Sequence, residues 1–152
     1  MALLLGRLGL SLKIAAQALL SPVAYAACAL IVREGRVLLV RHSYVQGWLL
    51  PGGGVGRGEP AEEAVLREMR EEIGLLSCAA PRQFGLYTRK SGWATNVIVL
   101  FQIDDAQFKF VPNFEVRAVE FVDPLSPPAD TPPSVRRRLR EFAGMESRSP
   151  YW

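Results

Sequence analysis

Apolar and β-branched residues gather in short runs along the middle of the chain, and these runs predict β-strands. Residues 26 to 32 and 37 to 41 are two such runs, and the Glu34-Gly35 pair between them suits a tight turn, so we expect a β-hairpin. Further β-rich runs cover residues 83 to 90, 95 to 103 and 116 to 122. The run at 95 to 103 is apolar enough to be buried on both faces of a sheet.

A helix is predicted after the first hairpin. Glu59-Pro60 is typical of a helix start, because proline suits the first helical position and an acidic residue complements the positive end of the helix dipole. Gly74 indicates the end. Four apolar side chains fall within an arc of about 100° on this helix, and we expect that face to pack. They are Val65, Leu66, Met69 and Ile73.

A second helix is predicted at about residues 132 to 142, after a proline-rich connection at 124 to 133. A mixed β-sheet sandwiched by helices accounts for this order of elements, so the predicted fold class is α/β, with an α/β/α sandwich architecture. The chain has 152 residues, of which 49% are hydrophobic, and can therefore form one domain with a proper core.

Residues 1 to 21 predict an amphipathic helix in front of that domain. One stripe is leucine-rich and the opposite side is polar: Leu5, Leu8, Leu12 and Leu19 against Arg7, Ser11, Lys13, Gln17 and Ser21. The resulting boundaries are 1–23 for the N-terminal helix, 24–143 for the domain and 144–152 for a C-terminal tail.

Two other interpretations of the N-terminal segment are disfavoured. A secretion signal would be cleaved near Ala24-Tyr25-Ala26, at the entrance to the first core strand, and Lys13 interrupts its apolar run. A membrane span from Ile14 to Val32 would consume the same strand. The apolar side of the helix must still be covered, so we expect a peripheral membrane contact or a homodimer.

Charge and cysteine content narrow the function classes. The net charge of +3 is concentrated in the run from Arg136 to Arg140, which is typical of an exposed helix face, and no aromatic RNA-binding motif is present, so no nucleic-acid partner is expected. Cys28 and Cys78 lack C-x-x-C spacing, which favours a reduced, cytoplasmic protein. The lone histidine, His42, is more typical of packing or exposure than of a ligand.

The predicted helix between Pro60 and Gly74, with the glycine-rich segment before it, contains candidate catalytic residues. Glycines at positions 52 to 54, 56 and 58 predict a loop, since each would cost roughly 1 kcal/mol inside a helix. On the helix that follows, Glu68, Glu71 and Glu72 share an arc of about 100° and would repel one another unless cations lay among them. Arg67, four residues before Glu71, supplies part of the compensation. A solvated acidic face is the ordinary interpretation, but the glycine loop favours a divalent-metal site beside bound phosphates.

These residues resemble the signature of the Nudix (MutT-like) hydrolases, G-x5-E-x7-R-E-U-x-E-E-x-G-U, where U is aliphatic. Every fixed position is filled at the right spacing, by Gly53, Glu59, Arg67, Glu68, Met69, Glu71, Glu72, Gly74 and Leu75. The resemblance covers about residues 24 to 143. It implies a Nudix-type fold and hydrolysis, by metal-activated water, of the phosphoanhydride in a nucleoside diphosphate linked to another group.

The resemblance also implies roles for single residues. Mg²⁺ or Mn²⁺ would be held by Glu68 and Glu72, with Glu71 and the Gly53 carbonyl contributing. Arg67 would orient the carboxylates, while Glu59 and Gly74 would be structural. The general base varies in the family, so Glu71 and Glu115 are both candidates, and the number of ions stays open.

Residues outside the signature should select the substrate. Candidate binding residues are Arg41, Trp48, Gly54, Tyr87 and Arg89, with Lys90, Tyr44 and Trp93 as weaker ones. The aromatic rings among these candidates could stack on a nucleotide base, although such side chains more often pack in the core. Arginines could meet phosphates, although exposed strand ends are equally consistent. The marks of ADP-ribose, dinucleoside-polyphosphate and coenzyme A hydrolases are absent from the sequence, so a nucleoside triphosphate or a broad nucleotide range is the residual choice. The alternative is a non-catalytic nucleotide-sensing module.

Overall fold

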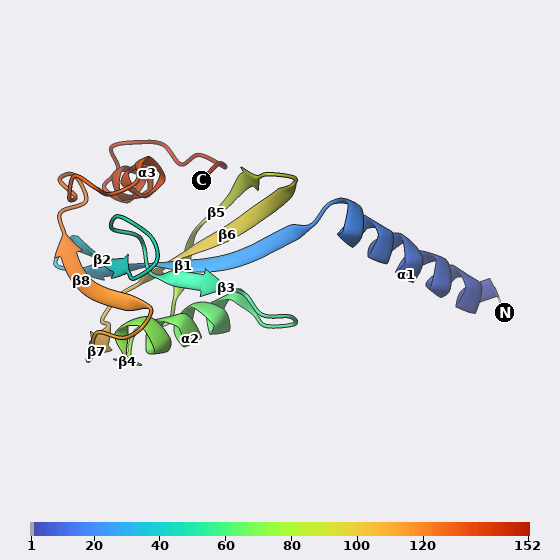
Figure 1. The fold of residues 1–152 in the computed structure, drawn as a ribbon, viewed down its shortest axis with the longest axis horizontal. Coiled ribbons are helices and arrows are strands. Elements are labelled where there is room, and N and C mark those ends of the chain that lie inside the picture. Colours follow the sequence, from blue (N-terminus) through green and yellow to red (C-terminus); the bar gives the residue numbers. More distant parts are fainter. Residues whose placement is uncertain (1) are drawn as a thin grey trace.

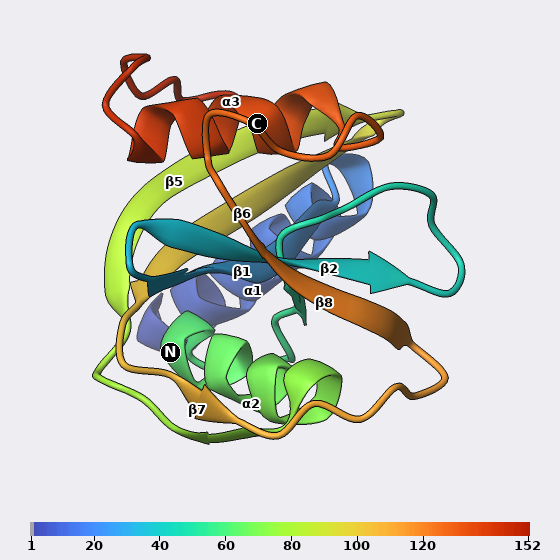
Figure 2. The ribbon, with the colours of Figure 1, turned by 90° about the vertical axis from the view of Figure 1, so that its left-hand side faces the viewer.

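The structure is a computed structural model that describes residues 2 to 152, with side chains described from Ser11 onward. Two helices, α2 (Ala61–Ile73) and α3 (Pro133–Phe142), lie on opposite sides of a β-sheet (Figures 1 and 2). The expected α/β/α sandwich is confirmed. The strands are β1 (Val23–Arg33), β2 (Arg36–His42), β3 (Gly52–Gly54), β4 (Leu75–Ser77), β5 (Arg82–Ser91), β6 (Ala94–Ile103), β7 (Gln107–Phe108) and β8 (Val116–Val122).

The main sheet is mixed, as predicted. Its strand order is β5-β6-β1-β2-β8, with β3 added beside β1, and β1 runs parallel to β6 while the other pairs are antiparallel. The predicted β1–β2 hairpin is confirmed: Arg33 pairs with Arg36, and both turn residues, Glu34 and Gly35, have positive φ, as a type I′ turn requires. Strands β4 and β7, which the sequence pattern did not predict, pair separately. The prediction of loop is wrong for residues 52 to 54, which form β3 because their backbone pairs with β1.

Strand β1 shares one of its edges between two partners, and this arrangement places the glycine loop. Its start, at Ala26 to Cys28, pairs with β3, whereas its end pairs with β2. The segment between β2 and β3 therefore leaves the sheet and returns to it. Strand β3 consists of three glycines and brings the start of the loop alongside the centre of the sheet.

Alternating side chains of the sheet build two cores. The core on the α2 side contains Val65, Met69 and Ile73 of the helix, with Val99, Phe101 and Ile103 of β6. The core on the α3 side contains Val135 and Leu139 of the helix with Leu100 of β6. Strand β6, which lies between β5 and β1, is thus buried on both faces from Ile98 to Phe101, as its run of apolar residues predicted.

Helix α2 begins one residue later than expected. Pro60 is the N-cap, with φ −65° and ψ 141°, and Ala61 is the first helical residue. The predicted end is confirmed: Gly74 has φ 69° and ψ 44°, and its amide donates to carbonyls of the last turn. An added Cβ at Gly74 would lie 2.4 Å from the Lys109 carbonyl oxygen, so the close approach of the β7 segment also requires glycine.

The prediction that the arginines of α3 form an exposed face is wrong for Arg138. Arg138 is fully buried, and its guanidinium donates to the Glu141 carboxylate at 2.8 Å and to the Tyr151 carbonyl at 2.9 Å. It lies 4.1 Å from the ring centroid of Tyr87 and 5.5 Å from that of Trp152. A buried cation needs such partners, because desolvation without them would be prohibitive.

Residues 144 to 152, predicted as a tail, pack against the domain. The amide of Thr88 donates to the Pro150 carbonyl, and the Thr88 carbonyl accepts from the Trp152 amide, so Tyr151 forms a parallel bridge with β5. The amide of Ser149 donates to Glu141 at 3.0 Å. This segment therefore covers part of the outer edge of β5.

Helix α1 (Ala2–Leu20) extends away from the sandwich (Figure 1). The predicted helix is confirmed, and residues 11 to 20 are exposed, including Leu12, Ile14, Leu19 and Leu20. The side chains of Leu5 and Leu8, which belong to the predicted leucine stripe, and of Arg7, on the predicted polar side, lie outside the described residues. Within residues 2 to 152, no helix combines the length and apolar character needed to cross a membrane.

Candidate active site

The glycine loop lies directly against the carboxylates of α2. The Gly52 amide donates to Glu72 Oε2 at 2.9 Å. A Cβ built on Gly53 would lie 2.5 Å from Oε1 of Glu68, so only glycine lets the loop approach this carboxylate so closely. Gly52 has φ 145°, and a Cβ there would lie 2.3 Å from the Ala27 carbonyl oxygen of β1. The pairing of β3 with β1 thus fixes the loop over the helix.

Arg67 links the loop to three acidic residues. Its guanidinium forms two hydrogen bonds with Glu59, of 2.9 and 3.0 Å, and one of 2.7 Å with Glu68. It also reaches Glu71 at 3.5 Å and the Gly54 carbonyl at 2.9 Å. The hydrogen bonds from Arg67, helped by one from the Gly56 amide, lower the pKa of Glu59 to about 2. The Arg67 guanidinium thus joins Glu59 and Glu68 to the carbonyl of the glycine loop.

Glu72 is the most deeply buried carboxylate of the helix. It is 1% exposed, and burial raises its pKa to about 8; the Gly52 hydrogen bond opposes this rise, and the charges of Glu68, Glu115 and Glu71 add to it. Its Oε1 has no hydrogen-bond partner among the described residues and lies 3.5 Å from His42 Nε2. Such an oxygen, buried and unpaired, suits a bound cation.

Glu115 is brought to Glu72 by the loop before β8. The Asn113 side chain accepts from the amides of Glu115 and Val116 at 2.9 and 2.8 Å, and its amide group donates to the Glu72 carbonyl at 3.4 Å. The loop is thereby tied to the last turn of α2. The carboxylate of Glu115 is exposed and accepts from the Tyr44 hydroxyl at 3.1 Å. Both proton-acceptor candidates, Glu71 and Glu115, therefore remain accessible.

A cavity of about 560 Å³ opens beside this cluster. It is lined by the end of β2 and the following segment, residues 41 to 47, together with Arg117 and Asp130. His42 lines the cavity and also lies next to the Glu72 carboxylate, so the cavity adjoins the carboxylate cluster. Arg41 forms an ion pair with Asp130 at 2.6 Å, so its charge at the rim is already partly neutralised.

Two of the rings predicted to meet a base are core residues. Tyr87 is 1% exposed, its hydroxyl donates to Glu141 at 2.9 Å, and Arg138 and Trp152 cover the ring. The prediction of base contact is wrong for Tyr87. Trp48 is 8% exposed, packs in the α3-side core and carries the Arg41 guanidinium 4.9 Å from its ring, which leaves little ring surface for a base.

The remaining substrate candidates are exposed. Trp93 occupies the β5–β6 turn and is 80% exposed. Gly54 is exposed at the end of β3.

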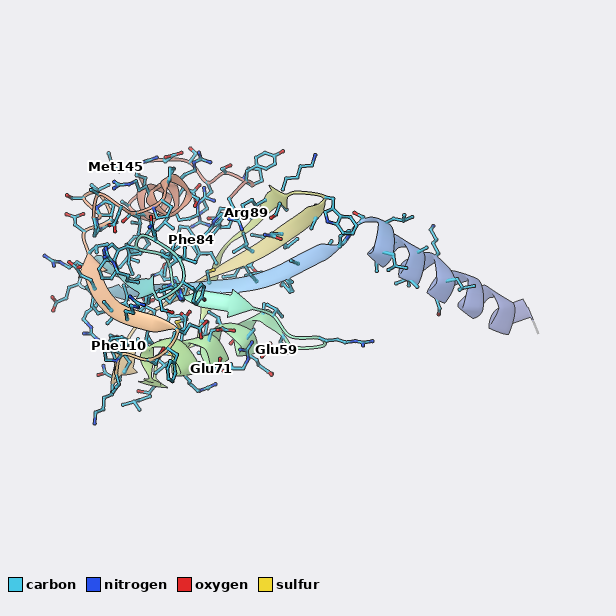
Figure 3. All side chains as sticks on the ribbon, viewed as in Figure 1. Glu59, Glu71, Phe84, Arg89, Phe110 and Met145 are labelled. Atoms are coloured by element: carbon cyan, nitrogen blue, oxygen red, sulfur yellow. The ribbon has the colours of Figure 1, made fainter. Side chains whose placement is uncertain are left out.

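The position of Arg89 differs from that of the acidic residues. In Figure 3, Arg89 lies on the opposite side of the sheet from Glu59 and Glu71. Burial raises the pKa of the Cys28 thiol to about 12, the charges of Glu72 and Glu68 add to the rise, and Arg89 opposes it. Arg89 therefore lies within electrostatic range of the strand that faces the glycine loop.

Two residues of this site were not predicted from the sequence. His42 was assigned to packing or exposure, yet it is 7% exposed and lies next to Glu72. Asn113 was not singled out at all, although it positions Glu115. A lone histidine at a strand end and an asparagine in a loop carry no local pattern, and only the fold brings them to the helix.

The fold and the acidic helix beneath a glycine loop define an α/β/α sandwich protein with a carboxylate cluster, and the comparisons identify the family. The sequence profile of the NUDIX domain matches residues 22 to 142. A Bacillus subtilis (strain 168) protein, provisionally named 8-oxo-dGTP diphosphatase, is 32% identical over 107 residues, which cover 70% of each chain. The chain belongs to the Nudix family.

Further relatives agree with this assignment. An RNA pyrophosphohydrolase of Shewanella piezotolerans (strain WP3 / JCM 13877) is 49% identical over 43 residues, 28% of this chain and 25% of the relative. The crystal structure of the MutT protein from Methanosarcina mazei Go1 matches with a TM-score of 0.67 and 25% identity, covering 84% of this chain and 98% of the other. A MutT NUDIX hydrolase from Burkholderia pseudomallei shares the fold, with a TM-score of 0.69 and 24% identity over 78% and 96% of the two chains.

Proposed function

We propose that the protein is a divalent-metal-dependent pyrophosphohydrolase acting on a nucleoside triphosphate or a broad range of nucleotides. The observation that carries the proposal is the Glu72 carboxylate. One of its oxygens is fixed by the Gly52 amide, and the other is buried, unpaired and directed toward His42 and the cavity. The names of the Bacillus and Shewanella relatives, a diphosphatase and a pyrophosphohydrolase, support the reaction class.

Each part of the site has a task in this proposal. Glu68 and Glu72, with Glu71 and the Gly53 carbonyl, would hold Mg²⁺ or Mn²⁺; oxygen donors of this kind fit hard cations. When bound, the cation supplies charge stabilisation for the phosphates and acidifies water. Arg67 holds Glu68 and the loop in place. The cavity next to His42 would receive part of the nucleotide, and Arg41, which lines it, would approach the phosphates.

Glu71 and Glu115 are the two candidates for accepting a proton. The Glu71 side chain is 54% exposed and reaches Arg67 only at 3.5 Å, whereas Glu115 accepts from Tyr44. Loss of the base should remove the acidic limb of the pH–rate profile, and loss of the other carboxylate should leave that limb in place. Comparing the pH profiles of Glu71→Gln and Glu115→Gln therefore distinguishes them.

A substrate screen tests the proposal. Nucleoside triphosphates, ADP-ribose, sugar nucleotides, dinucleoside polyphosphates and RNA with a 5′-triphosphate would be incubated with Mg²⁺ or Mn²⁺ and the products identified. We expect a nucleotide product from at least one substrate and at least a hundredfold lower kcat in Glu72→Gln. Glu63→Gln, an exposed acid in the first turn of α2, is the matched control and should keep wild-type turnover.

The alternative, a module that senses a nucleotide without cleaving it, predicts a different result. Wild-type protein would then bind a nucleotide of the screen and release no product with either cation. Equal turnover by the wild type and Glu72→Gln would also overturn the proposal, because the carboxylates would not be holding the working ion. We further propose that the enzyme works in the cytoplasm, which the free thiols Cys28 and Cys78 support.

A further inference from the structure

His42, Glu72 and Glu115 converge from three separate elements. His42 ends β2, Glu72 lies in the last turn of α2 and Glu115 precedes β8. One ligand atom from each lies within 4.8 Å of the ligand atoms of the other two. This set shares Glu72 with the signature and differs from it in offering an imidazole nitrogen, that of His42.

Two of these side chains are buried with unsatisfied polar atoms. The side chains of His42 and Glu72 are 6% and 1% exposed. Among the described residues, His42 Nδ1 and Glu72 Oε1 have no hydrogen-bond partner. A buried, unsatisfied polar group costs about 1 to 3 kcal/mol, and a charged one costs more. The structure therefore contains a cluster that a ligand would stabilise, and Oε1 of Glu72 points into it.

The spacing of the donor atoms favours an ion over a water molecule. His42 Nε2 and Glu72 Oε1 are 3.5 Å apart, which is long for a hydrogen bond between them. An ion about 2.1 Å from each atom would subtend an angle of about 113°, close to tetrahedral. A water about 2.8 Å from each would subtend only about 77°, too narrow for two good hydrogen bonds.

The neighbouring residues keep this cluster apart from Glu68. Oε2 of Glu72 accepts from the Gly52 amide and can still bind a cation through its other lone pair, whereas Oε1 lies 3.5 Å from His42 Nε2. The Glu68 carboxylate lies against Gly53 and accepts from Arg67 at 2.7 Å. Asn113 holds the Glu115 backbone, and the exposed Glu115 side chain can rotate to close the remaining gap. Glu72 thus lies between two sets of candidate ligands, Glu68 with the glycine loop on one side and His42 with Glu115 on the other.

We propose that His42, Glu72 and Glu115 form a second cation position, with His42 as a nitrogen ligand, beside the one expected at Glu68 and Gly53. The proposal rests on the proposed function only in taking Glu72 as a ligand. Imidazole suits Zn²⁺, Co²⁺ and other late divalent cations, whereas Mg²⁺ prefers an all-oxygen shell. This position therefore selects Co²⁺ or Zn²⁺ over Mg²⁺, and the Glu68 position does not.

Metal titration of the full chain without nucleotide tests this inference. Co²⁺ and Mg²⁺ would be titrated by calorimetry into chelator-treated wild type, His42→Gln and Glu115→Gln, and the visible Co²⁺ absorption recorded. We expect Co²⁺ affinity to fall at least tenfold in both variants and the His42→Gln spectrum to change. Mg²⁺ affinity should change less than threefold in His42→Gln. Glu120→Gln, an exposed acid on β8, is the matched control and should bind Co²⁺ like the wild type.

The outcomes separate this inference from the proposed function. Wild-type Co²⁺ affinity and an unchanged spectrum in His42→Gln would overturn the second position. Because Glu115 is exposed, Glu115→Gln should fold normally, and its Co²⁺ affinity decides the question if His42→Gln unfolds. A protein that binds Co²⁺ as expected and cleaves no nucleotide would remove the proposed function and leave this position standing.

Discussion

Arg67 binds Glu59 through two hydrogen bonds at once, one from Nε at 2.9 Å and one from a terminal nitrogen at 3.0 Å. Such a two-point contact fixes the guanidinium plane, which a lysine could not do. The same guanidinium reaches Glu68 and the Gly54 carbonyl, so Glu59 acts on the glycine loop and on the carboxylate cluster through Arg67.

The Arg67–Glu59 pair predicts an acid-sensitive contribution to stability. The pKa of Glu59 falls from 4.5 to about 2 on folding, because Arg67 and the Gly56 amide hydrogen-bond to its charged form. A lowered pKa stabilises the fold fully above about pH 4.5, and this contribution disappears as the pH falls toward 2. Urea unfolding at pH 6 and pH 3 should show a larger loss of stability in wild type than in Glu59→Gln. Equal losses would contradict the assignment.

Gly53→Ala should weaken cation binding with little effect on stability. The added Cβ would meet the end of the Glu68 side chain at 2.5 Å, and that flexible end can move aside, which displaces the expected ligand. We expect about tenfold weaker Mg²⁺ binding by calorimetry and a free energy of unfolding within about 1 kcal/mol of wild type. Gly54→Ala is the matched control, since a Cβ there meets nothing within 4 Å. Equal Mg²⁺ affinities in the two variants would count against Glu68 as a ligand.

Arg138→Met should destabilise the protein by about 3 to 5 kcal/mol, because it leaves the buried Glu141 carboxylate without its cation. Arg137→Met, next in sequence, removes only a partly exposed contact with Glu146 at 3.7 Å and should cost less than about 0.5 kcal/mol. Chemical denaturation measures both. A loss below about 1 kcal/mol for Arg138→Met would show that the ion pair does not stabilise the α3 side.

Removal of residues 2 to 20 should leave the domain intact. Helix α1 extends away from the sandwich, and the Pro22 carbonyl that accepts from the Thr95 amide is retained in the shortened chain. We expect a Tm within about 2 °C of the full chain by calorimetry. If α1 forms a homodimer, deletion halves the solution mass. If it contacts membranes, the mass stays the same and binding to anionic vesicles is lost.

The elements that the sequence pattern predicted are those with their own periodicity. The β1–β2 hairpin and α2 each carry a local signal, in the Glu34-Gly35 turn and in the spacing of Val65, Met69 and Ile73. Strands β3, β4 and β7 have only two or three residues each, and β3 contains only glycine, so their extended conformation depends on partners distant in sequence.

The helix α3 shows how a charge run can conceal a buried position. Val135, Leu139 and Phe142 form an apolar stripe at helical spacing, and Arg138 lies beside that stripe. The run of arginines favoured solvent exposure for all of them. At the site, the clustering of Glu68, Glu71 and Glu72 followed from one helix, whereas the approach of His42 and Glu115 depends on how β2 and β8 pair across the sheet.

The C-terminal segment that ends at Trp152 protects the exposed edge of the sheet from pairing with another molecule. Strand β5 is the outermost strand beside β6, and an open strand edge can recruit the same edge of another molecule. The backbone groups of Thr88 are instead occupied by Pro150 and Trp152. Removing the last five residues would uncover this edge, and the shortened protein should then assemble into β-rich aggregates at concentrations where the intact chain stays dispersed.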